Sequence, residues 1–148
     1  MAATAGQIAE AGRIPGERIA TSIETSDSST FTTSETALQS VTAAVVSGRT
    51  YRVKWATRLS SSVANDQIGA NIREDSVAGA QLAGDNIQVF GASSTNGWPF
   101  RAEVEYTADA TESKTFVATG TRISGSGNCF REAASNRPSY LYVDYIRG

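Results

Sequence analysis

Large side chains alternate almost without interruption along the last residues of the chain, 138–148. Successive residues of a β-strand point to opposite faces, so the pattern predicts a strand with apolar groups on both faces. One face would carry Tyr140, Tyr142 and Ile146, and the other would carry Leu141, Val143 and Tyr145. Such a strand is typical of the centre of a sheet that is covered on both sides, by a second sheet or by a neighbouring subunit.

Two further segments alternate as clearly, but each has only one apolar face. Residues 49–59 place aromatic and branched side chains on one side and basic side chains on the other, and residues 100–106 alternate in the same way. Each pattern is typical of an antiparallel strand with one face on the core and one in water. Because Glu103 and Glu105 share the wet face, we expect them to form cross-strand ion pairs with basic neighbours such as Arg52 and Lys54, not to act as catalytic carboxylates.

Shorter alternating segments are separated by clusters of Gly, Ser, Asn and Asp, which are turn signals. They are residues 18–24, 31–46 (as two short strands with a break near Ser34), 67–75, 77–82, 86–90, 115–123 and 128–133. The pattern predicts about eight to ten short strands with no helix between them, which is typical of an all-β sandwich or barrel. We expect an antiparallel, jelly-roll-like β-sandwich, and an immunoglobulin-like strand order also fits the spacing.

Residues 1–17 precede the first predicted strand and are mostly Ala, Gly and other small or polar residues. We interpret them as an extended N-terminal arm, and residues 18–148 as a single β-sandwich domain of ordinary length. The arm is either a disordered terminus or a segment that becomes ordered against another protein. In the second case its candidate contacts are Ile8, Ile14 and Pro15.

The composition argues against several classes of function. The net charge of −2 argues against nucleic acid as a partner, because phosphate binding requires a basic surface. No apolar run approaches the ~18 residues of a membrane helix, and the N-terminal residues lack the basic and apolar regions of a secretory signal. A single cysteine, Cys129, permits no internal disulfide and suits synthesis in a reducing cytoplasm. We expect its side chain to be buried as a small hydrophobic group, with a modestly exposed thiol as the alternative.

Histidine is absent from the chain. This absence removes the Ser-His-Asp and Cys-His catalytic arrangements, histidine metal sites and the commonest general base at neutral pH. The oxygen ligands near Asp66 and Asp109 do not have the spacing of a calcium loop. We therefore expect no enzymatic activity, no cofactor and no metal.

Trp98 lies in residues 91–99, a segment rich in turn residues that we interpret as a long loop. Three roles suit a tryptophan in this position. It could cap the open end of the sandwich, stack on a sugar ring as in carbohydrate-binding sandwiches, or contact a second subunit.

Six segments, taken in their order along the chain, resemble a family of small virion-associated proteins of tailed phages of actinobacteria. They are Thr30–Thr36, Ser47–Val53, Ile72–Leu82, Ala102–Ala108, Lys114–Gly120 and Tyr140–Gly148. The opening Thr4–Ile8 is also similar to the start of many tail-associated proteins of these phages. The resemblance implies a component of the virion and brings no catalytic residues with it.

The resemblance leads us to expect a phage virion structural protein, made in the bacterial host cytoplasm. A capsid decoration protein attached to the major capsid protein through its N-terminal arm is the first expectation. A minor tail or tail-fibre component bound to tail proteins, or a carbohydrate-binding module for host attachment, is the alternative. We also expect a homo-oligomer, with a trimer favoured by analogy with other virions. Tyr140, Tyr142 and Ile146 would lie at its subunit interface, near a symmetry axis.

Overall fold

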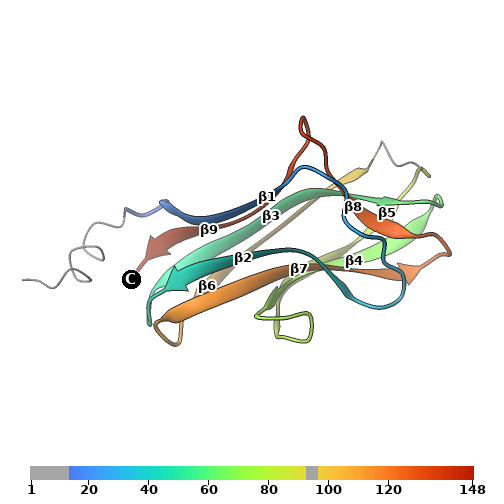
Figure 1. The fold of residues 1–148 in the computed structure, drawn as a ribbon. Helices are drawn as coiled ribbons and strands as arrows, with labels where there is room; N and C mark the ends of the chain where they lie inside the picture. The colour runs from blue at the N-terminus through green and yellow to red at the C-terminus, as the bar shows by residue number, and fades with distance from the viewer. Residues whose placement is uncertain (1–13, 93–96) are drawn as a thin grey trace, which may run out of the picture.

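The computed structural model describes residues 14–92 and 97–148. Within these ranges the chain forms nine β-strands and no helix. The strands are β1 (Arg18–Glu24), β2 (Thr36–Val45), β3 (Thr50–Ser61), β4 (Asp66–Glu74), β5 (Gln81–Val89), β6 (Trp98–Thr107), β7 (Glu112–Ser124), β8 (Cys129–Glu132) and β9 (Ser139–Arg147). They form two antiparallel sheets packed face to face (Figure 1). Sheet A has the order β1-β9-β3-β6, with β8 paired to the C-terminal end of β3. Sheet B has the order β2-β7-β4-β5.

The strand pairs are nested within one another along the chain. β4 pairs with β5, β3 with β6, β2 with β7 and β1 with β9. The chain is therefore one long hairpin, with its tip between β4 and β5, that folds over itself. Two further pairs, β3 with β9 and β4 with β7, then join its parts into the two sheets. This arrangement is a jelly roll and confirms the predicted all-β, antiparallel sandwich.

β9 lies between β1 and β3, as its pattern predicts for a central strand. Leu141 and Val143 are fully buried against sheet B, whereas Tyr140 on the opposite face is 37% exposed. The core that covers the inner face includes two edge-to-face aromatic pairs, Trp55 with Phe100 and Tyr106 with Phe116. Such pairs add about 0.5–1.5 kcal/mol to the burial of their rings. One face of β9 is thus covered by this chain, and the other is not.

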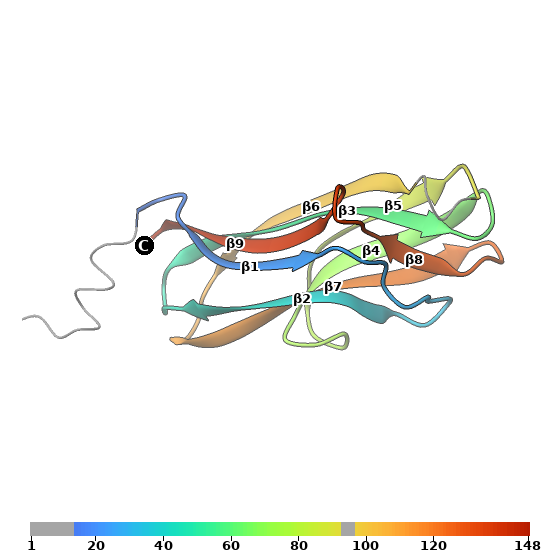
Figure 2. The same cartoon turned by 45° about the horizontal axis from the view of Figure 1, so that its top comes forward.

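The sandwich has two long edges, at which a strand of sheet A lies beside a strand of sheet B. β1 and β2 lie along one edge, and β6 and β5 along the other (Figure 2). The C-terminus lies at the same end of the sandwich as the start of β1 (Figure 1). Both faces of the molecule are therefore bounded by edge strands whose outer side has no partner strand within the described ranges.

Three predicted boundaries are wrong, for local reasons. Residues 31–46 form the single strand β2 preceded by an isolated bridge between Phe31 and Cys129. Residues 77–82 and 86–90 do not form two strands, because β5 runs through Gly84, which lies opposite Asn71. A Cβ on Gly84 would meet the side-chain oxygen of Asn71, so the glycine allows a close approach and does not mark a turn. Trp98, predicted in a loop, begins β6 by pairing with Leu59.

The segment before β1 is hydrogen-bonded to β9 from Gly16 onward. The amide of Gly16 donates to the carbonyl of Tyr145, and the amide of Tyr145 donates to the carbonyl of Glu17. Ile14 and Pro15 are exposed, whereas Ile8, the other predicted arm contact, lies outside the described residues. In the part of the chain that the structure describes, no helix has the length and apolar character to cross a membrane.

A buried carboxylate fastens two connections at the end of the sandwich. Asp66, at the start of β4, accepts hydrogen bonds from the hydroxyl of Ser61 and from the amides of Ser126 and Gly127. Burial by itself raises the pKa of Asp66, but these hydrogen bonds favour the ionised form and the net effect lowers the pKa. The ionised side chain therefore links the β3–β4 and β7–β8 connections.

Candidate functional site

The outer face of sheet A carries cross-strand rows of side chains from β9, β3 and β6. Within each row the three residues are direct neighbours across the strands. The rows are Tyr140–Ala56–Arg101, Tyr142–Lys54–Glu103 and Asp144–Arg52–Glu105. Residues of one row come from positions up to 92 apart in the sequence, as for Arg52 and Asp144. The pairing register of three strands therefore decides which side chains meet on this face.

Ion pairs hold the second and third rows. Arg52 contacts Glu103 and Glu105, each at 3.1 Å, and Lys54 contacts Glu103 at 3.2 Å. These contacts confirm the predicted cross-strand ion pairing of the two glutamates. Exposed pairs of this kind contribute about 0–1 kcal/mol each, so they organise the face more than they stabilise the fold.

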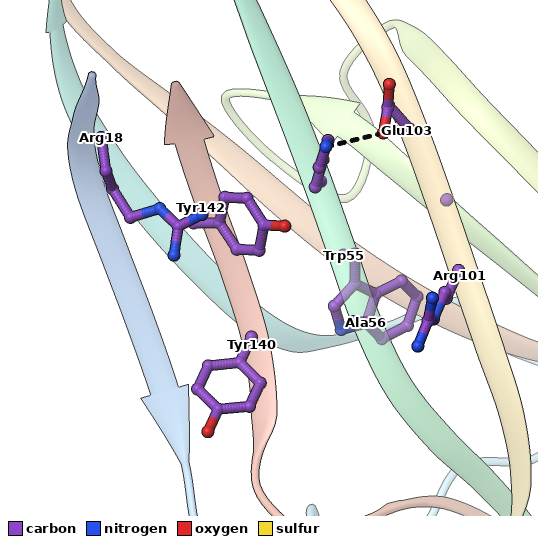
Figure 3. A pocket seen from close by; sticks show the side chains of 9 residues that line it. Arg18, Trp55, Ala56, Arg101, Glu103, Tyr140 and Tyr142 are labelled. Atoms are coloured by element: carbon purple, nitrogen blue, oxygen red, sulfur yellow. Dashed lines mark ion pairs between the residues drawn. The ribbon is translucent and has the colours of Figure 1, made fainter. Parts of the chain in front are cut away.

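Ala56 leaves a hollow in the middle of the first row, between Tyr140 and Arg101. The hollow has a volume of about 440 Å³ and is open to solvent (Figure 3). Its lining comprises Arg18, Lys54, Trp55, Ala56, Arg101, Ala102, Glu103, Tyr140 and Tyr142. A second hollow of about 410 Å³ shares Ala56, Arg101 and Tyr140 and adds Thr57, Arg58, Pro99, Arg137 and Pro138. We call the two together the Ala56 groove.

The two tyrosines of the groove differ in how they are held. The guanidinium carbon of Arg18 lies 3.5 Å from the ring centroid of Tyr142, and its Nε donates to Asp144 at 3.0 Å. Figure 3 shows Arg18 reaching from β1 to the ring of Tyr142, whose hydroxyl points toward β3. This cation–π contact braces Tyr142. Among the described residues no cation lies over the ring of Tyr140, which is partly exposed and open to a ligand.

The first row, Tyr140–Ala56–Arg101, carries polar groups that are not paired with other side chains of the described residues. Among the described residues, neither the hydroxyl of Tyr140 nor the guanidinium of Arg101 has a hydrogen-bond or ion-pair partner. Five basic side chains line the groove, and Glu103 is its one carboxylate; the basic residues are Arg18, Lys54, Arg58, Arg101 and Arg137. In a chain with a net charge of −2, the groove is therefore a local basic region.

The other predicted site residues lie apart from this groove. Trp98 is 39% exposed and packs edge to face on Phe90, with 5.2 Å between ring centroids, where β6 begins. Its side chain is not part of the groove lining. Ile146 lies on the outer face of β9, beyond Asp144 as seen from Tyr142, and also outside the lining. The structure thus brings together Tyr140 and Tyr142 but not Trp98.

Sequence reasoning missed Ala56 and Arg101 as site residues. The alternation of their strands does place both on wet faces, as the structure confirms for Arg101. A small residue among long basic ones was the available signal for Ala56. What the pattern could not give is that Tyr140 and Arg101 flank Ala56 on its two sides.

A separate hollow, of about 530 Å³, lies on the outer face of sheet B and is lined by polar side chains, two glycines and Ile123. Its carboxylate Glu35 already accepts hydrogen bonds from Arg73, Asn71 and Thr119. The hydrogen bond from Arg73 is the main reason that the pKa of Glu35 is lowered, against the opposing effect of burial. Glu35 is thus engaged within the protein, and none of the described residues that line this hollow is aromatic.

A thiol nucleophile would depend on Cys129, and a metal site would depend on a cluster of acidic or cysteine side chains. Cys129 is fully buried, and burial raises the pKa of its thiol, which is the environment of an inert cysteine. This agrees with the predicted small buried side chain. Within residues 14–92 and 97–148, no three acidic or cysteine side chains lie together in a way that could hold a metal ion.

No family model and no curated protein matches the chain. Among solved structures, it is similar to the CBM22-1 xylan-binding domain of Xyn10C from Paenibacillus barcinonensis, with 8% identity and a TM-score of 0.43 over 93% of this chain and 99% of that one. A CBM4 structure is 9% identical, with a TM-score of 0.35 over 72% of this chain and 60% of that one. A structure of infectious bursal disease virus, Gx strain, is 14% identical, with a TM-score of 0.33 over 89% of this chain and 38% of that one. Likenesses at this level do not indicate what this chain binds.

Proposed function

We propose that the protein is a structural component of a bacteriophage virion, and specifically a capsid decoration protein without enzymatic activity. The resemblance of six segments to virion-associated proteins of actinobacterial phages is the main support. In the fold, the proposal is supported by the position of the residues just before β1. Gly16 and Glu17 are hydrogen-bonded to β9 at one end of the sandwich, and residues 1–13 precede them in the sequence. Attachment through them would leave both outer sheet faces free.

In this proposal the N-terminal residues bind the major capsid protein, and the jelly roll projects from the particle. The protein is made in the host cytoplasm and resides in the virion as a homo-oligomer, with a trimer favoured. A minor tail or tail-fibre component, with tail proteins as partners, is the alternative place in the virion.

Deleting residues 1–13 tests the proposed attachment. The deletion keeps Gly16 and Glu17, which hydrogen-bond to Tyr145, so we expect an unchanged melting temperature. We expect the shortened protein to bind at least tenfold more weakly than the full chain to virions assembled without it. Tyr140→Ala is the matched control and should bind like the full chain. Undiminished binding of the shortened protein would make the arm hypothesis wrong.

Electron microscopy of virions with and without the protein separates the two virion locations. We expect additional density on the capsid surface when the protein is present. Density on the tail alone would favour the minor tail alternative, and the absence of the protein from purified virions would contradict both.

Saccharide binding is the second candidate function, and the Ala56 groove favours it. An exposed Tyr140, a braced Tyr142 and polar side chains within one open groove provide a stacking surface together with hydrogen-bonding groups. A pull-down on host cell walls with Tyr140→Ala and Trp98→Ala as separate variants tests it. We expect Tyr140→Ala to lose binding and Trp98→Ala to retain it, each with unchanged stability.

A further inference from the structure

The slot between Tyr140 and Arg101 is the most distinctive part of the Ala56 groove. Ala56 is the direct cross-strand neighbour of Tyr140 on β9 and of Arg101 on β6. Tyr140 and Arg101 are therefore separated by two strand spacings, about 10 Å between their Cα atoms, with only a methyl group between them. An aromatic ring and a guanidinium thus flank a floor that is low enough to admit a ligand.

The slot continues along β3 in both directions. The two hollows that share Ala56 extend from Lys54 to Arg58, about 13 Å along an extended strand. The groove is therefore long enough for an oligomer, with the slot at its middle. Lys54 and Glu103 lie at one end, and Arg58 and Arg137 lie at the other.

The groove is positioned to recognise its ligand through side chains alone. β3 is hydrogen-bonded to a strand on each side, to β9 or β8 on one side and to β6 on the other. Its backbone therefore cannot pair with an extended peptide, which binds to sheet edges by adding a strand. A sugar ring, in contrast, is bound by stacking on an aromatic ring and by hydrogen bonds to side chains.

The charge of the slot specifies the ligand further. Arg101 is exposed and has no carboxylate partner among the described residues, in contrast to Lys54 and Arg18, which pair with Glu103 and Asp144. A guanidinium binds a carboxylate or a phosphate through two parallel hydrogen bonds, which are stronger than bonds to a neutral hydroxyl. A neutral saccharide would leave this capacity unused.

We propose that the Ala56 groove binds an anionic oligosaccharide, with one sugar ring on Tyr140 and the carboxylate or phosphate of that sugar on Arg101. This proposal rests on saccharide binding as the second candidate function. It adds the charge of the ligand and Arg101 as the residue that binds the charged group. Single-stranded nucleic acid also combines stacking with negative charge. The chain's net charge of −2, together with Glu103 in the groove, favours a ligand with few charges over a polyphosphate backbone.

Titration calorimetry on the full chain with matched probes tests the proposal. The probes are an oligogalacturonate, the same oligomer with its carboxylates methyl-esterified, an oligosaccharide of mannose 6-phosphate, and a single-stranded DNA. We expect the oligogalacturonate, the phosphorylated oligosaccharide or both to bind at least tenfold more tightly than the neutral ester. Comparison of the oligogalacturonate with the phosphorylated oligosaccharide distinguishes a carboxylate from a phosphate as the charged group.

Three variants assign the binding to the slot. We expect Arg101→Gln to weaken the anionic probe about tenfold or more and the neutral ester less than about twofold, because it removes the two charge-assisted hydrogen bonds that only an anion can accept in parallel. Tyr140→Ala should weaken both probes by a similar factor, because stacking does not depend on the charge. Ala56→Tyr keeps every charge but fills the slot, and we expect it to abolish binding. A tyrosine at an outer position suits a strand, and the melting temperature checks each fold.

Arg147→Gln is the matched control, because Arg147 is exposed on sheet A but outside the groove. It should leave the affinity for the anionic probes unchanged. An equal loss in Arg147→Gln and Arg101→Gln, or normal binding by Ala56→Tyr, would show general charge attraction only and overturn the proposal. Equal binding of the neutral ester and both anionic saccharides would overturn the anionic assignment but leave saccharide binding intact. Binding of no saccharide probe, or tighter binding of the DNA, would overturn both without affecting attachment to the virion.

Discussion

Asp66 is a single carboxylate whose ionised form holds two chain connections together, through Ser61, Ser126 and Gly127. Its pKa in the folded protein is lower than the ordinary value of 3.8. The ionised form therefore contributes stability above that ordinary value, and the contribution is lost as the pH falls through the lower folded pKa.

We expect Asp66→Asn to lower the free energy of unfolding at pH 7 by about 1–3 kcal/mol, because an amide cannot accept all of these hydrogen bonds. The difference from the wild-type protein should shrink as the pH falls below about 4. Urea unfolding between pH 2 and pH 7 measures it. Asp109→Asn, at an exposed position, is the control and should change little. A difference that stays constant down to pH 2 would contradict the role of the ionised carboxylate.

At the residue scale, the sequence could predict the wet-face ion pairs but not this carboxylate. Arg52 and Glu103 belong to two strongly alternating strands, so their faces follow from the pattern. Asp66 ends residues 60–66, a Ser-rich segment that is typical of a loop. Ser126 and Gly127 lie at least 60 residues later in the sequence. Only their approach in the folded chain shows that Asp66 is buried and hydrogen-bonded.

At the scale of the element, the two faces of β9 have different roles, so adjacent residues of this strand differ in their environment. Leu141 is fully buried and Tyr140 is 37% exposed. We expect Leu141→Ala to cost about 2–5 kcal/mol of unfolding free energy, because it leaves a cavity in the core. Tyr140→Ala should cost less than about 1 kcal/mol. Chemical denaturation of the two variants measures the contrast, and equal losses would contradict the assignment of the two faces.

The strand boundaries show where local patterns fail. The sequence predicts β1, β3, β4, β6 and β7 within a few residues, because each alternates in its own right. It divides β5 at Gly84, since a glycine beside an aspartate is normally a turn signal. The structure instead uses Gly84 for the close approach of Asn71, a residue of the adjacent strand. The role of such a glycine depends on its cross-strand partner.

At the scale of the whole molecule, the oligomer remains a prediction. Tyr140, Tyr142 and Ile146 lie on a face that also carries Arg52 and Glu103, and the centres of subunit interfaces are depleted in such charges. The groove proposal requires the rings of Tyr140 and Tyr142 to stay open to solvent. We therefore expect a trimer to pack through the long edges of the sandwich, where β1 and β2 or β5 and β6 end the sheets.

Light scattering on the wild-type chain should give the mass of three chains of 15.6 kDa each. We expect the same mass for the double variant Tyr140→Ala/Tyr142→Ala. A fall of the variant to the mass of one chain would place the tyrosines at the subunit interface and contradict the groove proposal. A wild-type mass of one chain would contradict the trimer.

The sequence by itself determined the all-β class, the alternation of the main strands and the two-faced character of β9, because these depend on neighbours along the chain. The tertiary structure alone decided that Tyr140, Ala56 and Arg101 form one row. Their meeting depends on the register between strands that the nested hairpin brings together from distant parts of the chain. No local pattern specifies that register, so the groove and its charge became visible only in the folded sheet.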